Sequence, residues 1–196
     1  MEWDYEFDVV VVGSGNGALT AALCSHDGGA KTLVIEKSSQ FGGTSATSGG
    51  GVWIPNNRYA KAENVDDSDQ DARDYINSVS PEGMIKDELI ETYISEGPRM
   101  VDYLHENSQV KYRNLAHYPD YFPDNTGGKE GNRSMEPEPI FGTELGDDLG
   151  NLREQHPQTA FTMGPINMNF TQVEGQLLLG ALPGWKTQFA KLFTKY

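Results

Sequence analysis

The sequence predicts an α/β fold that opens with a strand, a helix and a second strand. Three observations in residues 7–36 support this prediction. Asp8 to Val12 is a short, β-branched apolar run, as expected for a strand buried on both faces. A glycine-rich turn and a helical segment from about Gly15 to His26 follow, and Gly28-Gly29 ends that segment. Lys31 to Ile35 then reads as a second buried strand.

The turn after the first strand has glycines at the spacing that dinucleotide-binding units use. Gly13 and Gly15 occupy the first two positions of G-x-G-x-x-G/A, and Ala18 occupies the third. Gly13 permits the sharp turn, Gly15 lets a pyrophosphate approach the backbone, and Ala18 lets the helix pack close to the strand. The helix start then directs unpaired N–H groups and the positive dipole end toward the phosphates.

An acidic residue stands where such a unit needs one. Glu36 lies 18 residues beyond Ala18, near the ~20-residue spacing of the acid that binds a ribose hydroxyl. A carboxylate accepts hydrogen bonds from a 2′-hydroxyl and repels a 2′-phosphate. The order of strand, glycines, helix, strand and acid therefore predicts dinucleotide binding in a Rossmann-like fold. The alternative is a glycine-rich turn of the same topology that holds no ligand.

A second glycine-rich segment, residues 40–57, follows the second strand closely. It is rich in small and hydroxyl-bearing residues, which suit close passage of backbone beside a ligand. A flexible linker is the alternative interpretation. Bulky residues at Phe41 and from Val52 to Pro55 bracket the glycines, and a solvated linker would not need such apolar anchors.

The remaining chain is predicted to be helical and rich in loops. Ser68 is placed to cap a helix that Pro81 ends, and Ile85 to Asn107 is a second helical pattern that Pro98 is expected to divide. Val110 to Arg113 is a candidate short strand.

After the segment from Ala116 to Tyr121, a long loop rich in Pro, Gly and acidic residues is predicted to run to about Gly150. Within it, Arg133 and Glu136 are expected to be surface or loop-pinning residues. Trp185 to Tyr196 reads as a basic amphipathic helix that is expected to pack on the body of the protein, with contact to a membrane surface as the alternative.

Composition excludes several classes of function. The formal net charge of −14 argues against a general nucleic-acid binder. The single cysteine, Cys24, excludes an internal disulfide framework and is expected to be a packing residue. The histidines show no metal-ligand spacing, so no metal site is predicted. No apolar run approaches the ~20 residues of a membrane span, and a cytoplasmic location is expected.

The motifs resemble the flavoprotein family of fumarate reductase and succinate dehydrogenase, and within it most closely the bacterial 3-oxosteroid 1-dehydrogenases. The resemblance covers essentially the whole chain. The segments that carry it are VVGSGNGALTAAL, EKSSQFGGTSATSGGGVWIPNN, HYPDYFPDNTGGKEGNRSMEPEP and LLLGALPGWKT. The first two are typical of the flavoprotein family, and the third indicates the steroid-oxidising branch.

The resemblance implies that FAD is the cofactor and a 3-ketosteroid the substrate. The residues that would contact the FAD phosphates and ribose are Gly13, Ser14, Gly15, Gly17, Ala18, Glu36, Lys37, Gly42, Gly43, Thr44 and Ser45. Ser48, Gly49, Gly50 and Gly51 would run past the isoalloxazine ring. Tyr121 matches a catalytic tyrosine of the family, with Tyr118 at a substrate-side aromatic position; an aromatic anchor of the loop is the alternative role for Tyr121. In the family that hydroxyl supports a second tyrosine, the base at steroid carbon 2, while the flavin takes hydride from carbon 1.

The chain also departs from the family in length. These enzymes run to several hundred residues more, so the sequence is expected to be an N-terminal part that lacks the substrate cap. Residues 1–57 would form the dinucleotide-binding core and flavin loop. Residues 58–196 would form a helical and loop excursion that carries the active-site tyrosine.

Three other functions stay open. A fumarate-reductase-like enzyme would need clustered arginines and histidines for a small unsaturated carboxylate, and the arginines are scattered through the sequence. A non-catalytic FAD-binding module is the second alternative. An NAD-dependent enzyme is the third, but it has no use for the Gly-Gly-Thr-Ser segment soon after Glu36.

Residues 1–196 alone are predicted to be a poor or inactive catalyst, because the base tyrosine and most of the steroid site of the family lie outside them. The measurement is steroid-dependent reduction of an artificial electron-accepting dye by the isolated chain. Sustained dye reduction above a steroid-free control would contradict this prediction.

Overall fold

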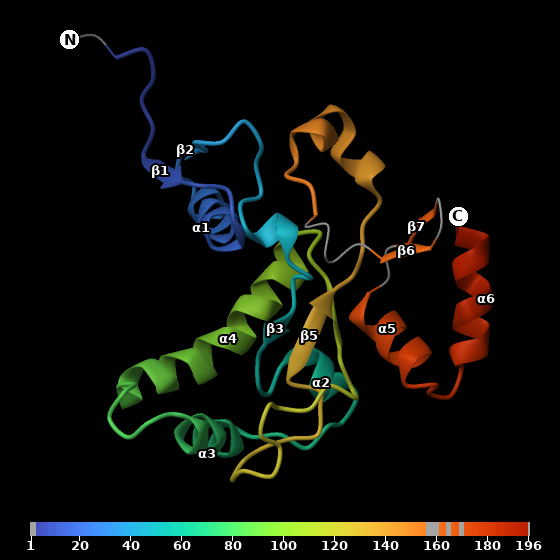
Figure 1. The fold of residues 1–196 in the computed structure, drawn as a ribbon. Helices are drawn as coiled ribbons and strands as arrows, with labels where there is room; N and C mark the ends of the chain where they lie inside the picture. The colour runs from blue at the N-terminus through green and yellow to red at the C-terminus, as the bar shows by residue number, and fades with distance from the viewer. Residues whose placement is uncertain (1–2, 156–160, 164–165, 169–170, 196) are drawn as a thin grey trace. The chain divides into compact units, whose positions relative to one another are not determined.

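The computed structural model describes residues 3–155, 161–163, 166–168 and 171–195, which fall into two compact units (Figure 1). The first unit comprises Met1–Gly50 and Ile140–Asn167, and the second comprises Gly51–Pro139 and Met168–Tyr196. Residues 140–167 thus belong to the same unit as the amino-terminal strands.

The first unit begins with the predicted strand, helix and strand. β1 (Val9–Val12) and β2 (Thr32–Ile35) are parallel, in a register that runs from Val9 opposite Thr32 to Val12 opposite Ile35. The connection is α1 (Asn16–Asp27), which contacts both strands. The helix ends where Gly28 and Gly29 donate to the carbonyl oxygens of Cys24 and His26. The predicted topology of this unit is therefore confirmed.

The expectation that these strands are buried on both faces is wrong for the described residues. Val10 is 52% exposed, Val12 is 77% exposed and Ile35 is 44% exposed. Exposure alternates along β1 because the described unit covers one face of a two-stranded sheet and leaves the other open. Cys24 on α1 is likewise exposed and does not have the packing role expected of it.

A segment from later in the sequence, Ile140–Asn167, also belongs to the first unit. η1 (Ser45–Thr47) and η2 (Gly142–Asn151) are 3₁₀ segments, and η2 is kinked at Gly146. Phe41 forms a parallel bridge with Leu152, and its backbone bonds Asn151 and Arg153 at 2.9 Å on either side. This bridge ties two segments that lie far apart in sequence. β6 (Phe161–Met163) and β7 (Ile166–Met168) pair with each other.

The second unit is built on a small antiparallel sheet. Its strands are β3 (Val52–Trp53), β4 (Tyr112–Asn114) and β5 (Ser134–Pro137), in the order β3-β5-β4. Its helices are α2 (Arg58–Ala62), α3 (Asp69–Val79), α4 (Asp87–Asn107), α5 (Gln172–Leu179) and α6 (Trp185–Lys195). Figure 1 shows α4 as a long green helix and α5 and α6 as a red pair.

The core of this unit lies between α4 and the sheet. Ile54, Val101, Tyr112 and Met135 form one buried cluster. A second cluster, Ala72, Ile90 and Ile94, joins α3 to α4. Ser68 caps α3 as predicted, since its hydroxyl accepts from the N–H of Asp71. The predicted carboxy-terminal helix is confirmed as α6, although Tyr196 and the side chains of Leu192 and Phe193 lie outside the described residues.

The prediction that Pro98 divides the second helical segment is wrong, because α4 runs unbroken through it. A proline inside a helix costs about 3 kcal/mol. Ile90 and Ile94 are buried on one side of Pro98, and Val101 and Leu104 on the other. Each such side chain contributes about 1.5–3 kcal/mol on burial, so continuous packing outweighs the cost of the proline.

The long loop predicted after Tyr121, up to about Gly150, contains β5 and two buried charges. Arg133 is 1% exposed and Glu136 is 2% exposed, so neither is a surface residue. Glu136 pairs with Arg113 at 2.9 Å across the sheet. Of the two roles expected for Arg133 and Glu136, the loop-pinning role is therefore confirmed and the surface role is wrong.

Arg133 joins three separate segments of the second unit. Its Nη2 donates to Asp67 at 2.7 Å and its Nη1 donates to Asp120 at 2.9 Å. The guanidinium also lies 5.5 Å from the ring centre of Trp53 and 5.7 Å from that of Tyr75. A charge this deeply buried is tolerated only when it is paired and hydrogen-bonded.

No helix among the described ranges has both the length and the apolar character that a bilayer crossing requires.

We expect Arg133→Met to lower the free energy of unfolding by about 3–5 kcal/mol, because it leaves two buried carboxylates without their cation. The measurement is urea denaturation followed by circular dichroism. Arg73→Met is the matched control, since the pair of Arg73 with Glu91 is 31% and 50% exposed and should contribute below about 1 kcal/mol. Equal losses in the two variants would contradict the prediction.

Candidate functional site

A cavity of about 720 Å³ opens at the amino end of α1 in the first unit. This volume lies within the ~300–1,000 Å³ range of ligand pockets. It is lined by Val12, Gly13, Ser14, Gly15, Asn16, Gly17, Ala18, Glu36, Lys37, Ser38, Gln40, Gly43, Thr44, Ser45 and Arg153. The structure therefore brings together most of the residues that the sequence predicts for phosphate and ribose binding.

The glycines of the first turn leave backbone open to this cavity. Gly13 has φ +98° and donates its N–H to Ile35 at 2.7 Å. A Cβ added at Gly13 or Gly17 would meet nothing within 4 Å, so both residues face open space. The first N–H groups of a helix have no partner within the helix and suit an anionic ligand.

Ser45 and Gly15 bring the second glycine-rich segment against the start of α1. The Ser45 hydroxyl accepts from the N–H of Asn16 at 3.0 Å. A Cβ at Gly15 would lie 3.4 Å from the same hydroxyl oxygen. Ser45 therefore satisfies one free donor of the helix, and the remaining donors stay available at the cavity.

Gly42 and Gly43 have different roles. Gly43 lines the cavity and faces the Gly15 backbone at 3.6 Å. Gly42 has φ +104°, and a Cβ there would lie 2.7 Å from the Ala46 Cβ. Its missing side chain thus makes room for Ala46 and Leu152 of the same unit, and its predicted contact with the cofactor stays a prediction.

Ser14 connects this segment to the acidic residue. The side chain is buried, accepts from the N–H of Gly42 at 2.9 Å and donates to Glu36 Oε2 at 2.5 Å. A direct contact of Ser14 with pyrophosphate stays a prediction. The hydroxyl fixes the direction of the Glu36 carboxylate, a role that the sequence analysis did not assign to it.

The Glu36 carboxylate is held at the rim of the cavity. Its Oε1 accepts from the N–H of Ser38 at 3.0 Å. The hydrogen bond from the Ser14 hydroxyl, and then that from Ser38, lowers the pKa of Glu36 below its ordinary value of 4.5. Two carboxylate oxygens offer about four acceptor positions, so capacity remains for a ribose hydroxyl.

Arg153 is a lining residue that the sequence analysis missed. It follows the Phe41–Leu152 bridge, and its N–H donates to the Phe41 carbonyl at 2.9 Å. This bridge brings a cation to the same cavity from more than a hundred residues further along the chain. No local motif surrounds Arg153, so no feature of the sequence indicates that it lines the cavity.

Ser48, Gly49 and Gly50 are not among the residues that line this cavity. The Ser48 hydroxyl accepts from the N–H of Gly50 at 3.0 Å, and Gly50 has φ +70°. Gly51 begins the second unit. Their predicted place beside the flavin ring stays a prediction.

The two predicted tyrosines lie in the second unit, on the loop after β4. Tyr121 is 83% exposed, and Tyr118 is partly buried. Partial burial, and then the neighbouring Tyr121 hydroxyl with which it shares a hydrogen bond, raises the pKa of Tyr118 above 10.0. The loop therefore presents two adjacent phenols, one of them largely open to solvent.

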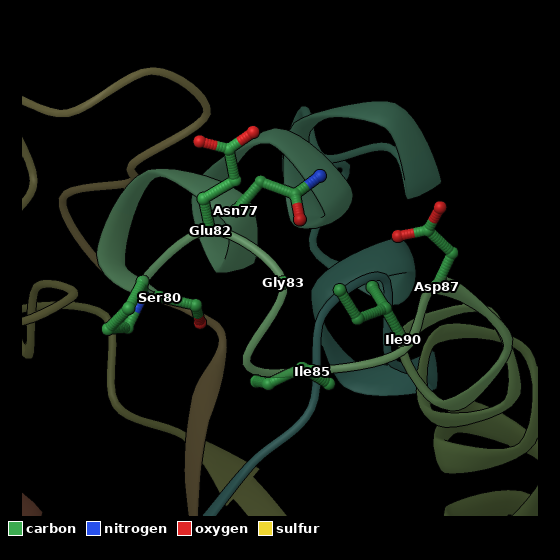
Figure 2. A pocket seen from close by; sticks show the side chains of 8 residues that line it. Asn77, Ser80, Glu82, Gly83, Ile85, Asp87 and Ile90 are labelled. Atoms are coloured by element: carbon green, nitrogen blue, oxygen red, sulfur yellow. The ribbon is translucent and has the colours of Figure 1, made fainter.

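Another hollow in the second unit, of about 280 Å³, lies where α3 leads into α4 (Figure 2). Its lining residues are Asn77, Ser80, Pro81, Glu82, Gly83, Ile85, Asp87 and Ile90. Acidic side chains and isoleucines both line this hollow, and its polar groups do not converge on one point as they would in a binding site. Among the residues that the structure describes, no cluster of histidine, cysteine and acidic side chains could hold a metal.

The family of the chain follows from a match that covers most of its length. A family model described as FAD binding domain matches residues 8–182. This chain belongs to that family. The match confirms the prediction of FAD as the cofactor of a Rossmann-like domain. The open glycine backbone, the helix start and the carboxylate at the rim fit the phosphates and ribose of such a cofactor.

Two 3-ketosteroid dehydrogenases are similar to the chain over most of its length. The 3-oxosteroid 1-dehydrogenase of Mycolicibacterium smegmatis is 38% identical over 168 residues, which are 86% of this chain and 29% of that protein. The crystal structure of 3-ketosteroid delta1-dehydrogenase from Sterolibacterium denitrificans, in complex with 1,4-androstadiene-3,17-dione, matches with a TM-score of 0.87 and 39% identity. The match covers 97% of this chain and 33% of that one.

A relative with a smaller ring substrate is similar as well. The 4-oxocyclohexanecarboxylate 2-dehydrogenase of Sinomonas cyclohexanicum is 38% identical over 157 residues, 80% of this chain and 27% of that protein. The chain thus spans about a third or less of the length of these relatives. The resemblance to 3-oxosteroid 1-dehydrogenases that its motifs predict is confirmed.

We expect FAD affinity to hold from neutral pH to about pH 4.5 and to fall as Glu36 becomes protonated below that value. A lowered pKa keeps the carboxylate ionised above the ordinary value, and its contribution is lost as the pH falls through the lowered one. Ser14→Ala removes the largest cause of the lowering, so the midpoint should move to higher pH. Quenching of FAD fluorescence on binding, recorded across this pH range, measures the midpoint.

Ser38→Ala is the matched control for this titration, because Ser38 holds Glu36 through its backbone N–H, which alanine keeps. Identical midpoints in the wild-type protein and Ser14→Ala would show that the Ser14 hydroxyl does not control the ionisation of Glu36.

Proposed function

We propose that the protein is an FAD-dependent dehydrogenase that introduces a double bond beside the ring ketone of a 3-ketosteroid. The observation that carries the proposal is the likeness to the steroid-bound dehydrogenase structure, at 39% identity over 97% of this chain. The matched region includes both the dinucleotide cavity and the tyrosine loop.

The first unit would bind and orient the cofactor. The N–H groups at the start of α1 and the glycine backbone would hold the diphosphate, with Arg153 supplying a cation at the same cavity. Glu36, directed by Ser14, would bind the adenosine ribose. Bound FAD supplies a two-electron acceptor, which removal of hydrogen from adjacent ring carbons requires.

The tyrosine loop would assist proton removal. A hydrogen atom on the carbon beside a ketone is acidic enough for a positioned base to remove it. A free phenol has a pKa near ~10, so a tyrosine needs a supporting hydrogen bond to act as that base. The Tyr121 hydroxyl would donate a hydrogen bond to a second tyrosine that acts as the base. This hydrogen bond would lower the free-energy cost of forming the phenolate of that second tyrosine. Its exposed position in the second unit is compatible with contact to a further segment or to substrate.

The arginines favour a ketosteroid over a small carboxylate. Five of the six arginines are paired with carboxylates of the second unit: Arg58 with Asp102 and Glu106, Arg73 with Glu91, Arg99 with Glu96, Arg113 with Glu136, and Arg133 with Asp67 and Asp120. The sixth, Arg153, lines the dinucleotide cavity. The described residues thus offer no arginine cluster for fumarate.

A monocyclic oxo acid is the second candidate substrate. It is favoured by the 38% identity to 4-oxocyclohexanecarboxylate 2-dehydrogenase, whose name also describes desaturation of a ring ketone. The same absence of a free arginine cluster among the described residues weighs against it.

The free, exposed Cys24 fits a reducing compartment, and we propose the cytoplasm as the location of the protein.

We expect the protein, expressed with any sequence that follows Tyr196 in its gene, to be yellow and to reduce an electron-accepting dye with a 3-ketosteroid. Tyr121→Phe should lower kcat by about 10²-fold or more, the scale of a lost proton-transfer contribution. Tyr5→Phe is the control, because Tyr5 is 81% exposed and belongs to the other unit.

Three comparisons decide among the candidates. Faster turnover of 4-oxocyclohexanecarboxylate than of the steroid would favour the monocyclic substrate. Fumarate reduction without steroid oxidation would overturn the dehydrogenase proposal. A yellow protein that acts on none of these substrates would indicate a non-catalytic FAD-binding module.

A further inference from the structure

We propose that Asp120 is a positioning residue for Tyr121, and that Trp53 and Arg133 hold Asp120 in that role. The inference rests on the proposed function, in which the Tyr121 hydroxyl takes part in proton removal. All four residues belong to the second unit.

Asp120 is buried directly beside the exposed tyrosine. It is 5% exposed, whereas Tyr121 is 83% exposed. Its Oδ1 accepts from the indole N–H of Trp53 at 2.7 Å. Its Oδ2 accepts from Arg133 Nη1 at 2.9 Å and from the N–H of Lys129 at 3.0 Å. One carboxylate therefore anchors the loop to three other points of the chain.

The backbone on both sides of Tyr121 is fixed as well. The N–H of Asp120 donates to the Lys129 carbonyl at 2.9 Å. The N–H of Phe122 donates to the Tyr75 hydroxyl at 3.3 Å. Since most of the Tyr121 ring is in solvent, its direction is set by these flanking anchors and by the hydrogen bond that its hydroxyl shares with Tyr118, more than by packing of the ring itself.

Trp53 is itself held rigidly. Its ring stacks on Tyr93 with centroids 6.2 Å apart and lies 5.9 Å from Tyr75. The Tyr93 hydroxyl donates to the Trp53 carbonyl at 2.5 Å. Trp53 follows Gly51, the end of the segment that is proposed to pass the flavin, by two residues. The Trp53–Asp120 hydrogen bond thus links that segment to the tyrosine loop within the second unit.

Arg133 makes the carboxylate a firm anchor. The guanidinium bonds Asp67 and Asp120 at once, and the Asp67 carboxylate also accepts from the N–H groups of Asn56 and Ser68. Charge-assisted hydrogen bonds of this kind are shorter and stronger than neutral ones. A catalytic group displaced by about 1 Å can lose about 10²-fold in rate, so the stiffness of this anchor bears directly on turnover.

Two substitutions test the proposal in the protein expressed with any sequence that follows Tyr196. Trp53→Phe keeps an aromatic ring for stacking and removes the N–H donor. Asp120→Asn keeps the size and removes the charge. Each is expected to lower kcat on a 3-ketosteroid by at least about tenfold, with KM changed by less than about threefold and the FAD content unchanged.

Tyr59→Phe is the matched control. Its hydroxyl accepts from the N–H of Tyr112 at 2.9 Å and bonds His105 at 2.8 Å, in the same unit but on other elements. It should destabilise the fold while keeping kcat within about twofold. The proposal is overturned if Trp53→Phe keeps wild-type kcat, or if Tyr59→Phe loses kcat equally. Trp53→Phe decides alone if Asp120→Asn does not fold.

Amide hydrogen exchange gives a readout that needs no substrate. Trp53→Phe should accelerate exchange in residues 117–129 and leave α4 unchanged. Unchanged exchange in this loop would overturn the positioning role even if the enzyme is active. Accelerated exchange in a protein that does not oxidise steroids would support the anchor and refute only the proposed function.

Discussion

The second unit depends on one buried cation placed between two buried carboxylates. Arg133 satisfies Asp67 and Asp120, and the excess negative charge is met by N–H donors from Trp53, Lys129 and neighbouring backbone. Ion pairs on surfaces contribute little, but removal of one member of a buried set is costly. This constraint fixes the relation of β3, the start of α3 and the tyrosine loop.

The first unit depends on a smaller and weaker arrangement. Ser14 accepts from Gly42 and donates to Glu36, so a single hydroxyl aligns the two glycine-rich segments and the acid. Ser45 joins the same segments through the start of α1. The cavity is therefore shaped by hydrogen bonds between loops, which keeps its backbone donors open instead of filling the space with side chains.

The sequence predicted what local spacing controls. Gly13, Gly15, Ala18 and Glu36 lie in one continuous unit whose topology brings them together. Arg153 could not be found, because only the Phe41–Leu152 bridge brings it to the cavity. Arg133 was misplaced, in part, because arginine is usually exposed and its partner Asp67 lies 66 residues away. Pro98 was misjudged because tertiary packing of α4 overrides a local rule.

The open face of the small parallel sheet has a consequence for handling the isolated chain. β1 and β2 each have one strand neighbour among the described residues, and Val10, Val12 and Ile35 project into solvent. Unpaired strand edges beside apolar side chains invite strand addition from a second molecule. Preparations of these residues alone should therefore self-associate as their concentration rises, and a fusion that covers the sheet should keep them dispersed.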